Sequence, residues 1–449
     1  MLFKPSRYNL ATRQADQFYL FNTNSLSKLS LDAALYPLLA DLLKTIDEQG
    51  CAPTADAAAE HAVSTLKYHG FIVDRDIDEL EIIRRRYSRA CTSGPLKLTI
   101  VPTLSCNMNC HYCYEGTEKN LRRWKLNERQ WRQLTKFADQ RLPHGGELIA
   151  HWFGGEPLLN KSAVYNLSER LMKLADGKEA DYSAWVTTNG YNLDQATTER
   201  LKACRVKKVQ VTFDGPREYH DRIRFVGSER VRRGSFDRIV DNVLFAADLF
   251  HVVVRLHVSP SNIDSYRRMV EELAERGFAE KVSYVSIHLL ENLDPRSRDS
   301  AHRSVEGHCF STKEFAALEE QLLRTAHDHG FKLKSPLAHA VGCMVDDDNS
   351  FLIDADGSIK QCDHYVGDPV SGYSHLEAPQ IVSHPENLSR WAYDRFSDRE
   401  CVGCTFFPIC LQGCLHRILA EDAPGKSCPP IRYNWERVLP LFHDMDSHC

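Results

Sequence analysis

Residues 1–93 open with an alternating pattern of apolar and polar side chains. Between Gln17 and Leu31 the alternation predicts a β-hairpin with its turn near Asn24–Ser25. Two helical segments are expected after it, at 33–48 and 56–68. This region therefore predicts a small α+β module, in which no residue stands out as chemically active.

From about Pro95 to Leu290 short apolar strands alternate with amphipathic helices. Such alternation is typical of βαβ units, which build a parallel sheet with right-handed crossovers. Six units suit an incomplete barrel whose active site lies at the carboxyl ends of the strands. The predicted strands are Leu96–Pro102, Leu148–Phe153, Tyr182–Thr187, Lys208–Phe213, Val252–Val258 and Val282–Leu289, and the predicted helices are Glu128–Arg141, Lys161–Leu174, Thr197–Ala203, Phe236–Leu249 and Ile263–Arg276.

The third region begins with a helix from about Lys313 to His327 and becomes loop-rich beyond Cys343. Within it, Phe351–Cys362 predicts a hairpin that turns at Asp356–Gly357. The expected organisation is an N-terminal domain at 1–93, a partial (β/α)6 barrel at 94–310 and a C-terminal domain at 311–449. The fold class is α/β.

Composition and charge narrow the class of protein. Of the 449 residues, 43% are hydrophobic and 26% charged, as in proteins that bury a sizeable core. A net charge of −5 without a polybasic arm gives no reason to expect a nucleic-acid partner. The sequence shows no signal-peptide layout at Met1–Leu10 and no membrane span, so we expect a cytoplasmic protein without a membrane partner.

Cysteine usage is unusual, because fifteen cysteines occur and seven of them lie between Cys343 and Cys428. In a reducing compartment disulfides are rare, so clustered thiols indicate bound metal. Four other cysteines, at positions 51, 91, 204 and 449, are expected to be ordinary thiols, since an isolated cysteine often acts as a small apolar residue.

The first cluster follows the first predicted barrel strand, with Cys106, Cys110 and Cys113 in the spacing C-x3-C-x2-C. Three thiolates can hold three irons of a cubane and leave the fourth iron without a protein ligand. An open metal position is what a reactant needs in order to bind. The alternatives are buried thiols or a zinc loop completed by His111, although structural zinc sites usually use two C-x2-C pairs.

This spacing after a first barrel strand resembles the radical S-adenosylmethionine (SAM) superfamily. The segment His151-Trp-Phe-Gly-Gly-Glu-Pro-Leu-Leu159 resembles the family's Gly-Gly-Glu motif, and Thr187-Thr-Asn-Gly190 and Thr212-Phe-Asp-Gly-Pro216 end later strands as in the family. The resemblance implies SAM contacts at Tyr112, Gly154, Gly155, Glu156, Pro157, Asn189, Asp214 and Arg255. For Arg255, a salt bridge to another barrel residue remains the alternative.

The resemblance also implies a mechanism. The open iron chelates SAM, and one electron from an external donor of the flavodoxin or ferredoxin type breaks a carbon–sulfur bond. The resulting 5′-deoxyadenosyl radical removes a hydrogen atom from the substrate, while the barrel orients the reactants and excludes water.

The seven later cysteines resemble the SPASM extension, which carries two auxiliary [4Fe–4S] clusters, so three [4Fe–4S] clusters are expected in all. The resemblance assigns Cys343, Cys362 and Cys414 to one cluster, and Cys401, Cys404, Cys410 and Cys428 to the other. A zinc ribbon is the alternative. The first set lacks an evident fourth ligand: His339, Asp346–Asp348 or Cys309 could serve, or the iron could be open. Asp214, Asp346–Asp348 and His364 are unranked candidates for an acid or base.

Radical SAM proteins with this extension mostly modify peptides and proteins. The N-terminal region, from Lys4-Pro-Ser-Arg-Tyr-Asn9 onwards, resembles winged-helix-like domains that bind the leader of a precursor peptide by β-augmentation. We therefore expect a maturase that installs a thioether or carbon–carbon crosslink in a ribosomal peptide. The alternatives are a formylglycine-type sulfatase maturase, an N-terminal module that only caps the barrel, and an iron–sulfur electron carrier. Against the carrier stand Gly-Gly-Glu and Arg255, because a carrier needs no SAM site.

Overall fold

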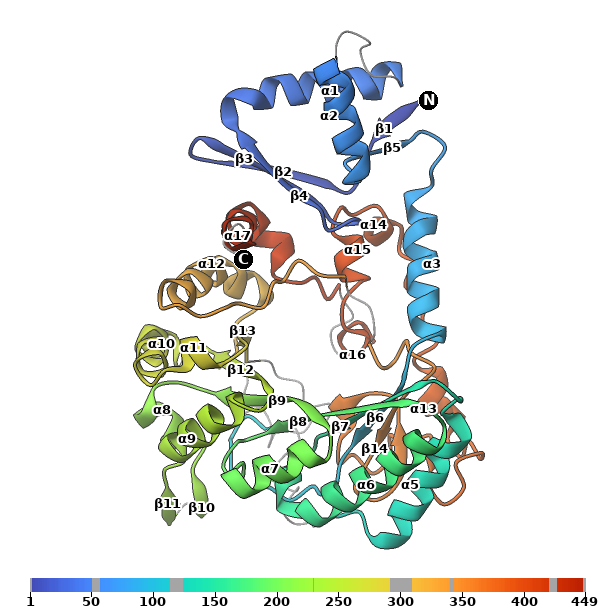
Figure 1. Cartoon of the computed structure of the whole chain (residues 1–449), viewed down its shortest axis with the longest axis vertical. Helices are drawn as coiled ribbons and strands as arrows, with labels where there is room; N and C mark the ends of the chain where they lie inside the picture. Colours follow the sequence, from blue (N-terminus) through green and yellow to red (C-terminus); the bar gives the residue numbers. More distant parts are fainter. Residues whose placement is uncertain are drawn as a thin grey trace.

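The computed structural model describes residues 2–50, 57–113, 124–228, 230–290, 309–339, 343–419 and 426–446. The N-terminal sheet and its helices lie at one end of the long axis, and the barrel lies at the other (Figure 1). Helices α12 (Thr312–Asp328) and α17 (Ile431–Asp446) lie between them, while α3 (Glu79–Thr92) runs along one side toward the barrel.

The N-terminal domain contains an antiparallel sheet in the order β2 (Asn9–Gln14), β3 (Gln17–Asn22), β4 (Lys28–Asp32). The β3–β4 pair confirms the predicted hairpin. Strand β2 was not predicted, and neither was the pairing of β1 (Phe3–Pro5) with β5 (Ile72–Asp74). The two predicted helices are present as α1 (Tyr36–Gln49), preceded by a 3-10 turn at Ala33–Leu35, and α2 (Ala57–Tyr68).

Both faces of this sheet are buried, because its side chains alternate between two cores. Phe18 and Leu20 pack with residues of α1 and α2. Tyr19 and Phe21 point the other way and pack against α17 and the segment around Phe406. The N-terminal domain is thereby joined to the C-terminal part of the chain by a continuous apolar core.

The barrel sheet has six parallel strands in sequence order, as predicted, with helices between them. The predicted barrel strands and helices begin and end within three residues of the observed ones. The strands are β6 (Leu96–Ile100), β7 (Glu147–Trp152), β8 (Asp181–Thr188), β9 (Val206–Phe213), β12 (His251–Val258) and β13 (Tyr284–Leu289), and the helices are α5 (Glu128–Arg141), α6 (Lys161–Gly177), α7 (Gln195–Ala203), α8 (Arg217–Ile223), α9 (Phe236–Ala247) and α10 (Tyr266–Glu275).

Burial along the strands separates an apolar outer face from a polar inner one. In β8, Ala184 and Val186 are buried in the core, whereas Trp185 and Thr187 on the opposite face stay partly accessible. Successive side chains of a strand point to opposite faces, so the accessible set lines the interior of the barrel. The barrel therefore has a polar lumen.

Three more strands extend this sheet beyond β6. Strand β14 (Ser350–Ile353) pairs in parallel with β6, and β15 (Ser358–Lys360) and β16 (Ser374–His375) follow it. The predicted hairpin at Phe351–Cys362 is confirmed, with Gly357 in the left-handed region at φ +95°. The pairing of β14 with the barrel was not predicted, and it joins the third region to the barrel by main-chain hydrogen bonds.

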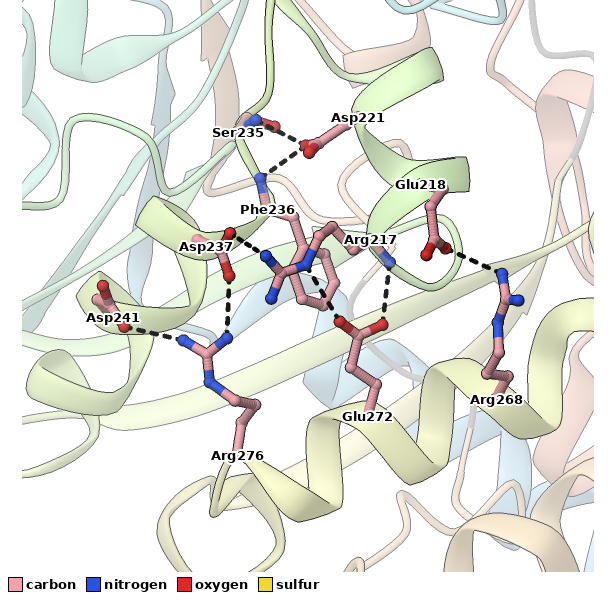
Figure 2. A network of polar contacts seen from close by, with 10 residues as sticks. All are labelled: Arg217, Glu218, Asp221, Ser235, Phe236, Asp237, Asp241, Arg268, Glu272 and Arg276. Atoms are coloured by element: carbon pink, nitrogen blue, oxygen red, sulfur yellow. Dashed lines mark hydrogen bonds and ion pairs between the residues drawn. The ribbon is translucent and has the colours of Figure 1, made fainter.

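Charged side chains connect three helices on the outside of the barrel (Figure 2). Asp237 of α9 accepts bonds from Arg217 of α8 at 2.5 Å and from Arg276, just after α10, at 2.9 Å. Asp221 accepts bonds from the amides of Ser235 and Phe236 at 2.6 and 2.8 Å, and so caps the start of α9. The remaining pairs are solvent-exposed, so each contributes little to stability.

Candidate active site

The loop that follows β6 brings Cys106, Cys110 and Cys113 to the carboxyl end of the barrel. The amide of Cys113 donates to the carbonyl of Cys110 at 3.1 Å, which closes a tight turn between these two cysteines. The Cys106 thiol lies 3.5 Å from the amide of Met108 and 3.9 Å from the side-chain nitrogen of Asn189. The three predicted cluster ligands therefore lie on one compact loop, and the predicted SAM contact Asn189 is beside it.

The Gly-Gly-Glu segment packs directly against this loop. The amides of Gly155 and Glu156 donate to the carbonyls of Thr103 and Ser105 at 3.3 and 2.9 Å. A Cβ atom added to Gly155 would lie 2.2 Å from the carbonyl oxygen of Leu104, so only glycine allows this approach. Gly154 has φ +108°, which also favours glycine.

The Glu156 side chain is fully buried and turned into the protein. Its carboxylate accepts bonds from the amides of Leu158 and Asn189 at 3.0 and 2.8 Å and from the hydroxyl of Thr188 at 2.7 Å. Burial raises the pKa of Glu156 above its usual value, although these bonds oppose the change. The carboxylate therefore connects the ends of β7 and β8, and a SAM contact in this segment remains a prediction that concerns its main chain. Pro157 begins the short 3-10 turn that follows.

Tyr112 and Asp214, both predicted SAM contacts, belong to one buried network. The hydroxyl of Tyr112 and the Nε of Arg224 each donate to Oδ2 of Asp214 at 2.6 Å, and His257 Nδ1 lies 3.1 Å from Oδ1. Asn262 donates to the main-chain carbonyl of Asp214 at 2.5 Å. Arg224, His257 and Asn262 were not predicted, because no motif marks them.

Burial and the neighbouring charges determine the protonation states of Asp214 and His257. Burial opposes ionisation of Asp214, yet the Arg224 guanidinium and His257 hold the pKa of this carboxyl well below its usual range. Burial lowers the pKa of His257 to about 4, and the charge of Arg255 acts in the same direction. At neutral pH the network therefore contains an ionised Asp214, a charged Arg224 and a neutral His257 that donates from Nδ1.

Arg255 lies on the inner face of β12, in register with Thr212 and Ser286 of the neighbouring strands. Its charge contributes, after burial, to lowering the pKa of His288. Arg255 therefore faces the lumen, and its pairing with SAM remains a prediction.

The lumen contains a second set of chemical groups. A cavity of about 1170 Å³, counting the space open to solvent, is lined by the inner faces of β6, β7 and β8 and by the segments that carry Cys343, Cys362 and Cys414. Inside it the imidazole of His151 stacks on Trp185 with ring centroids 3.5 Å apart, and its Nε2 lies 3.0 Å from the hydroxyl of Thr187.

The thiols of Cys343, Cys362 and Cys414, which line this cavity, influence one another's pKa values. Burial raises the pKa of the Cys362 thiol well above its usual range, and Cys343 and Cys414 add to the effect. Burial also opposes ionisation of Cys414, but a hydrogen bond from His364 and backbone amides bring its pKa below the usual value. Three thiols about one cavity fit the predicted cluster, which would need them deprotonated.

Three of the candidate fourth ligands bond to other groups. Both carboxylate oxygens of Asp346 bond to Arg395, at 3.1 and 2.7 Å, and Asp347 pairs with Lys97 at 2.9 Å. His339 Nε2 lies 2.9 Å from the main-chain carbonyl of Asn24 in the N-terminal domain. Neither His339 nor Cys309 is among the described residues that line the cavity. The main-chain amide of Asp348 donates to the carbonyl of Cys91 in α3.

The second set of thiols surrounds a separate cavity of about 310 Å³. Cys401, Cys404, Cys410 and Cys428 all line it, together with Phe406, Phe407 and Arg432. Arg432 donates to the Cys428 sulfur at 2.9 Å, and burial raises the pKa of Cys410 to about 12. Four thiols about one cavity fit an iron–sulfur cluster, and they also fit zinc.

Among the expected ordinary thiols, Cys204 is buried in the barrel core. Cys51 and Cys449 lie outside the described residues. In the parts of the chain that the structure describes, no helix is long and apolar enough to cross a membrane.

A parallel α/β barrel whose first strand leads into a C-x3-C-x2-C loop, braced by Gly-Gly-Glu, is the arrangement of a radical SAM domain. Residues 100–274 match the model of the radical SAM superfamily, so this part of the chain is similar to a radical SAM domain.

Several known proteins are similar to it. Radical SAM cyclopropyl synthase TigE of Paramaledivibacter caminithermalis is 27% identical over 171 residues, which are 34% of this chain and 35% of TigE. The matched part thus spans about a third of TigE. A cysteine-type anaerobic sulfatase-maturating enzyme of Clostridium novyi is 22% identical over 343 residues, which are 71% of this chain and 87% of that enzyme.

Two solved structures share the fold. Native anSMEcpe with bound AdoMet superposes with a TM-score of 0.58 at 18% identity, covering 79% of this chain and 100% of that one. Streptococcus suis SuiB bound to precursor peptide SuiA superposes with a TM-score of 0.52 at 14% identity, covering 94% of this chain and 98% of that one.

Proposed function

We propose that this chain is a radical SAM maturase that installs a thioether or carbon–carbon crosslink in a ribosomally made peptide. The observation that carries the proposal is the lumen itself. Its carboxyl end holds the Cys106 loop, and its wall holds the thiols of Cys343, Cys362 and Cys414. A peptide side chain in the lumen would lie between a radical source and a second redox group.

At the carboxyl end the residues bind and orient SAM. When bound, the Cys106–Cys110–Cys113 cluster supplies one-electron cleavage of SAM to a 5′-deoxyadenosyl radical. Tyr112, between Cys110 and Cys113, is held by Asp214 and Arg224 through bonds of 2.6 Å, so its ring is fixed within the cysteine loop. Arg255 offers a cation to the SAM carboxylate from the lumen face of β12.

Two auxiliary [4Fe–4S] clusters are part of the proposal, so the chain would hold three. Cys343, Cys362 and Cys414 would hold the one that faces the lumen, and Cys401, Cys404, Cys410 and Cys428 the other. An external flavodoxin or ferredoxin would reduce the protein. Clustered thiols that bind metal suit a reducing compartment, which supports a cytoplasmic location.

The N-terminal domain would bind the leader of the precursor peptide. Among the described strands, β4 pairs only with β3, which leaves one of its edges available for a further strand. Leu35 and Leu38, at the start of α1, are 52% and 68% exposed. A leader added to β4 as a strand could cover apolar side chains of this kind. This supports a winged-helix-like leader-binding role.

A sulfatase maturase is the second candidate, because the similarity to the C. novyi enzyme extends over 71% of this chain. The two functions differ in their products. A crosslink joins two residues of a peptide with loss of two hydrogens, whereas formylglycine formation converts one Cys or Ser of a sulfatase to an aldehyde and joins nothing.

The first test is SAM cleavage by the anaerobically reconstituted protein with dithionite. We expect 5′-deoxyadenosine from the wild type and none from Cys106→Ala, whose auxiliary iron should remain. If the wild type gives no 5′-deoxyadenosine, the enzyme assignment is wrong. Co-expression with the short peptide encoded beside this gene then tests the product, since mass spectrometry should show a loss of two hydrogens.

A further inference from the structure

The cluster proposed at Cys343, Cys362 and Cys414 has three thiol ligands, so its fourth iron is either open or bound by another group. We propose that the imidazole of His364 is this fourth ligand. The inference rests on the proposed function, which assigns a cluster to this site.

The position of His364 is the first observation. It follows Cys362 by two residues on the 3-10 turn Asp363–Tyr365. The ligand atoms of Cys362, Asp363 and His364 all lie within 4.8 Å of one another, and these residues line the same cavity as Cys343 and Cys414. The imidazole also hydrogen-bonds to the Cys414 thiol. His364 thus reaches thiols from two chain segments that are about fifty residues apart.

The other candidates are held elsewhere. Asp346 has both oxygens on Arg395. Asp347 bonds through Oδ2 to Lys97 at 2.9 Å and through Oδ1 to the amide of Asn349 at 2.9 Å. His339 contacts the N-terminal domain, outside the cavity lining.

Two neighbours of His364 compete with it, and chemistry separates them. Asp363 is a carboxylate, and hard oxygen ligands suit magnesium, calcium and manganese better than iron–sulfur clusters, whereas imidazole suits iron. His416, whose ring lies 5.0 Å from that of His364, has its Nδ1 3.3 Å from the hydroxyl of Tyr365. It is also outside the compact group around Cys362.

A histidine ligand changes what the site can do. A neutral imidazole in place of a thiolate makes an iron–sulfur cluster easier to reduce. It also closes the fourth iron, so the substrate would react in the lumen without binding to this cluster. Both consequences can be measured without a substrate.

The experiment uses full-length protein labelled with ¹⁵N-histidine, reconstituted anaerobically and reduced, and examined by pulsed EPR without SAM. Cys106, Cys110 and Cys113 are replaced by alanine, which removes the cluster nearest His111. Among the described residues that line the second cavity there is no histidine. A ¹⁵N coupling therefore reports on the lumen-facing site.

We expect the ¹⁵N coupling in this background, its loss in His364→Ala together with about one iron atom per chain, and its retention in the matched control His416→Gln. His364→Cys should restore the iron without the coupling and shift the reduction potential to a lower value. Because His364→Cys keeps a ligand, it tests the assignment even if His364→Ala loses the whole cluster.

Two results would overturn the inference, and they are distinguishable. If Cys362→Ala lowers the iron content by one cluster but no ¹⁵N coupling is seen, or if the coupling survives in His364→Ala, the cluster exists and His364 is not its ligand. If Cys362→Ala leaves the iron content unchanged, this site holds no cluster, and the auxiliary-cluster part of the proposed function fails as well.

Discussion

The two ends of the barrel lumen are held together by different arrangements of charged side chains. At the carboxyl end, Tyr112, Asp214 and Arg224 form a buried polar network around which the cysteine loop is arranged. At the other end, the thiols sit on loops held by ion pairs to distant segments, Asp347 to Lys97 and Asp346 to Arg395. The charges are buried at both ends, but at the carboxyl end they form one shared network, and at the other end they form two separate ion pairs that each attach a loop.

This difference predicts what a substitution at each end will destabilise. Loss of one partner from the shared network leaves the other charge buried without a counter-ion. Loss of an attachment between loops frees the loops while the barrel persists. Four changes test the comparison, in order of decreasing effect.

The largest effect is expected from Arg224→Met, which leaves Asp214 buried at 2% exposure without its cation. Breaking a buried pair in this way costs about 3–5 kcal/mol. Urea denaturation should show this loss, together with weaker SAM binding. The matched control is Arg276→Met in the exposed network of Figure 2, which should cost about 0.5 kcal/mol.

A double variant, Asp214→Asn with Arg224→Met, sharpens the result. Since it removes both charges, it should be less destabilised than Arg224→Met alone. A single-variant loss below that of the Arg276 control would contradict the view that this end depends on buried charge.

The next effect is expected from Arg395→Met at the other end. Arg395 holds Asp346 and also donates to the carbonyls of Leu411 and Gly413, just before Cys414. Its loss should cost about 3 kcal/mol and lower the iron bound at the lumen-facing cluster. Formation of 5′-deoxyadenosine should continue. Equal loss of SAM cleavage and auxiliary iron would show that the two ends are one unit.

This contrast also explains what could be predicted from the sequence. The strands, helices and cysteine loop follow local periodicity and short motifs, so their residue ranges were predictable. The pairing of β14 with β6, and the packing of Tyr19 and Phe21 against α17, join segments hundreds of residues apart. Such pairings leave no local signal. Arg224 and His257 were missed because their importance comes from side-chain bonds to Asp214, which no sequence motif marks.

A smaller effect is expected from Gly155→Ala. Its Cβ would lie 2.2 Å from the carbonyl oxygen of Leu104, so the Gly-Gly-Glu segment would have to move away from the cysteine loop. We expect a loss of about 1–3 kcal/mol and a higher SAM concentration for half-maximal cleavage. Gly177→Ala is the control, because a Cβ there meets no atom within 4 Å. If both variants behave alike, close approach at Gly155 is not required.

The smallest effect concerns pH and the network at the carboxyl end. The folded-state pKa of His257 is about 4, below the value of about 6.5 in an unfolded chain. A depressed histidine pKa means that the unfolded state binds the proton first. The stability it contributes is therefore complete above pH 6.5 and is lost as the pH falls toward 4.

Between pH 7 and 5.5 this one group should lower the free energy of unfolding by about 1 kcal/mol. His257→Gln removes the proton site but keeps an amide that can donate to Asp214. Its stability should therefore fall less steeply over the same range, and urea denaturation at several pH values measures the difference. His151 in the lumen has a pKa of about 3 because it is buried. Its contribution to the pH dependence has the same direction and is present in both the wild type and His257→Gln. Parallel pH profiles for the wild type and His257→Gln would mean that His257 takes up no proton on unfolding, and that Asp214 is held ionised by Arg224 alone.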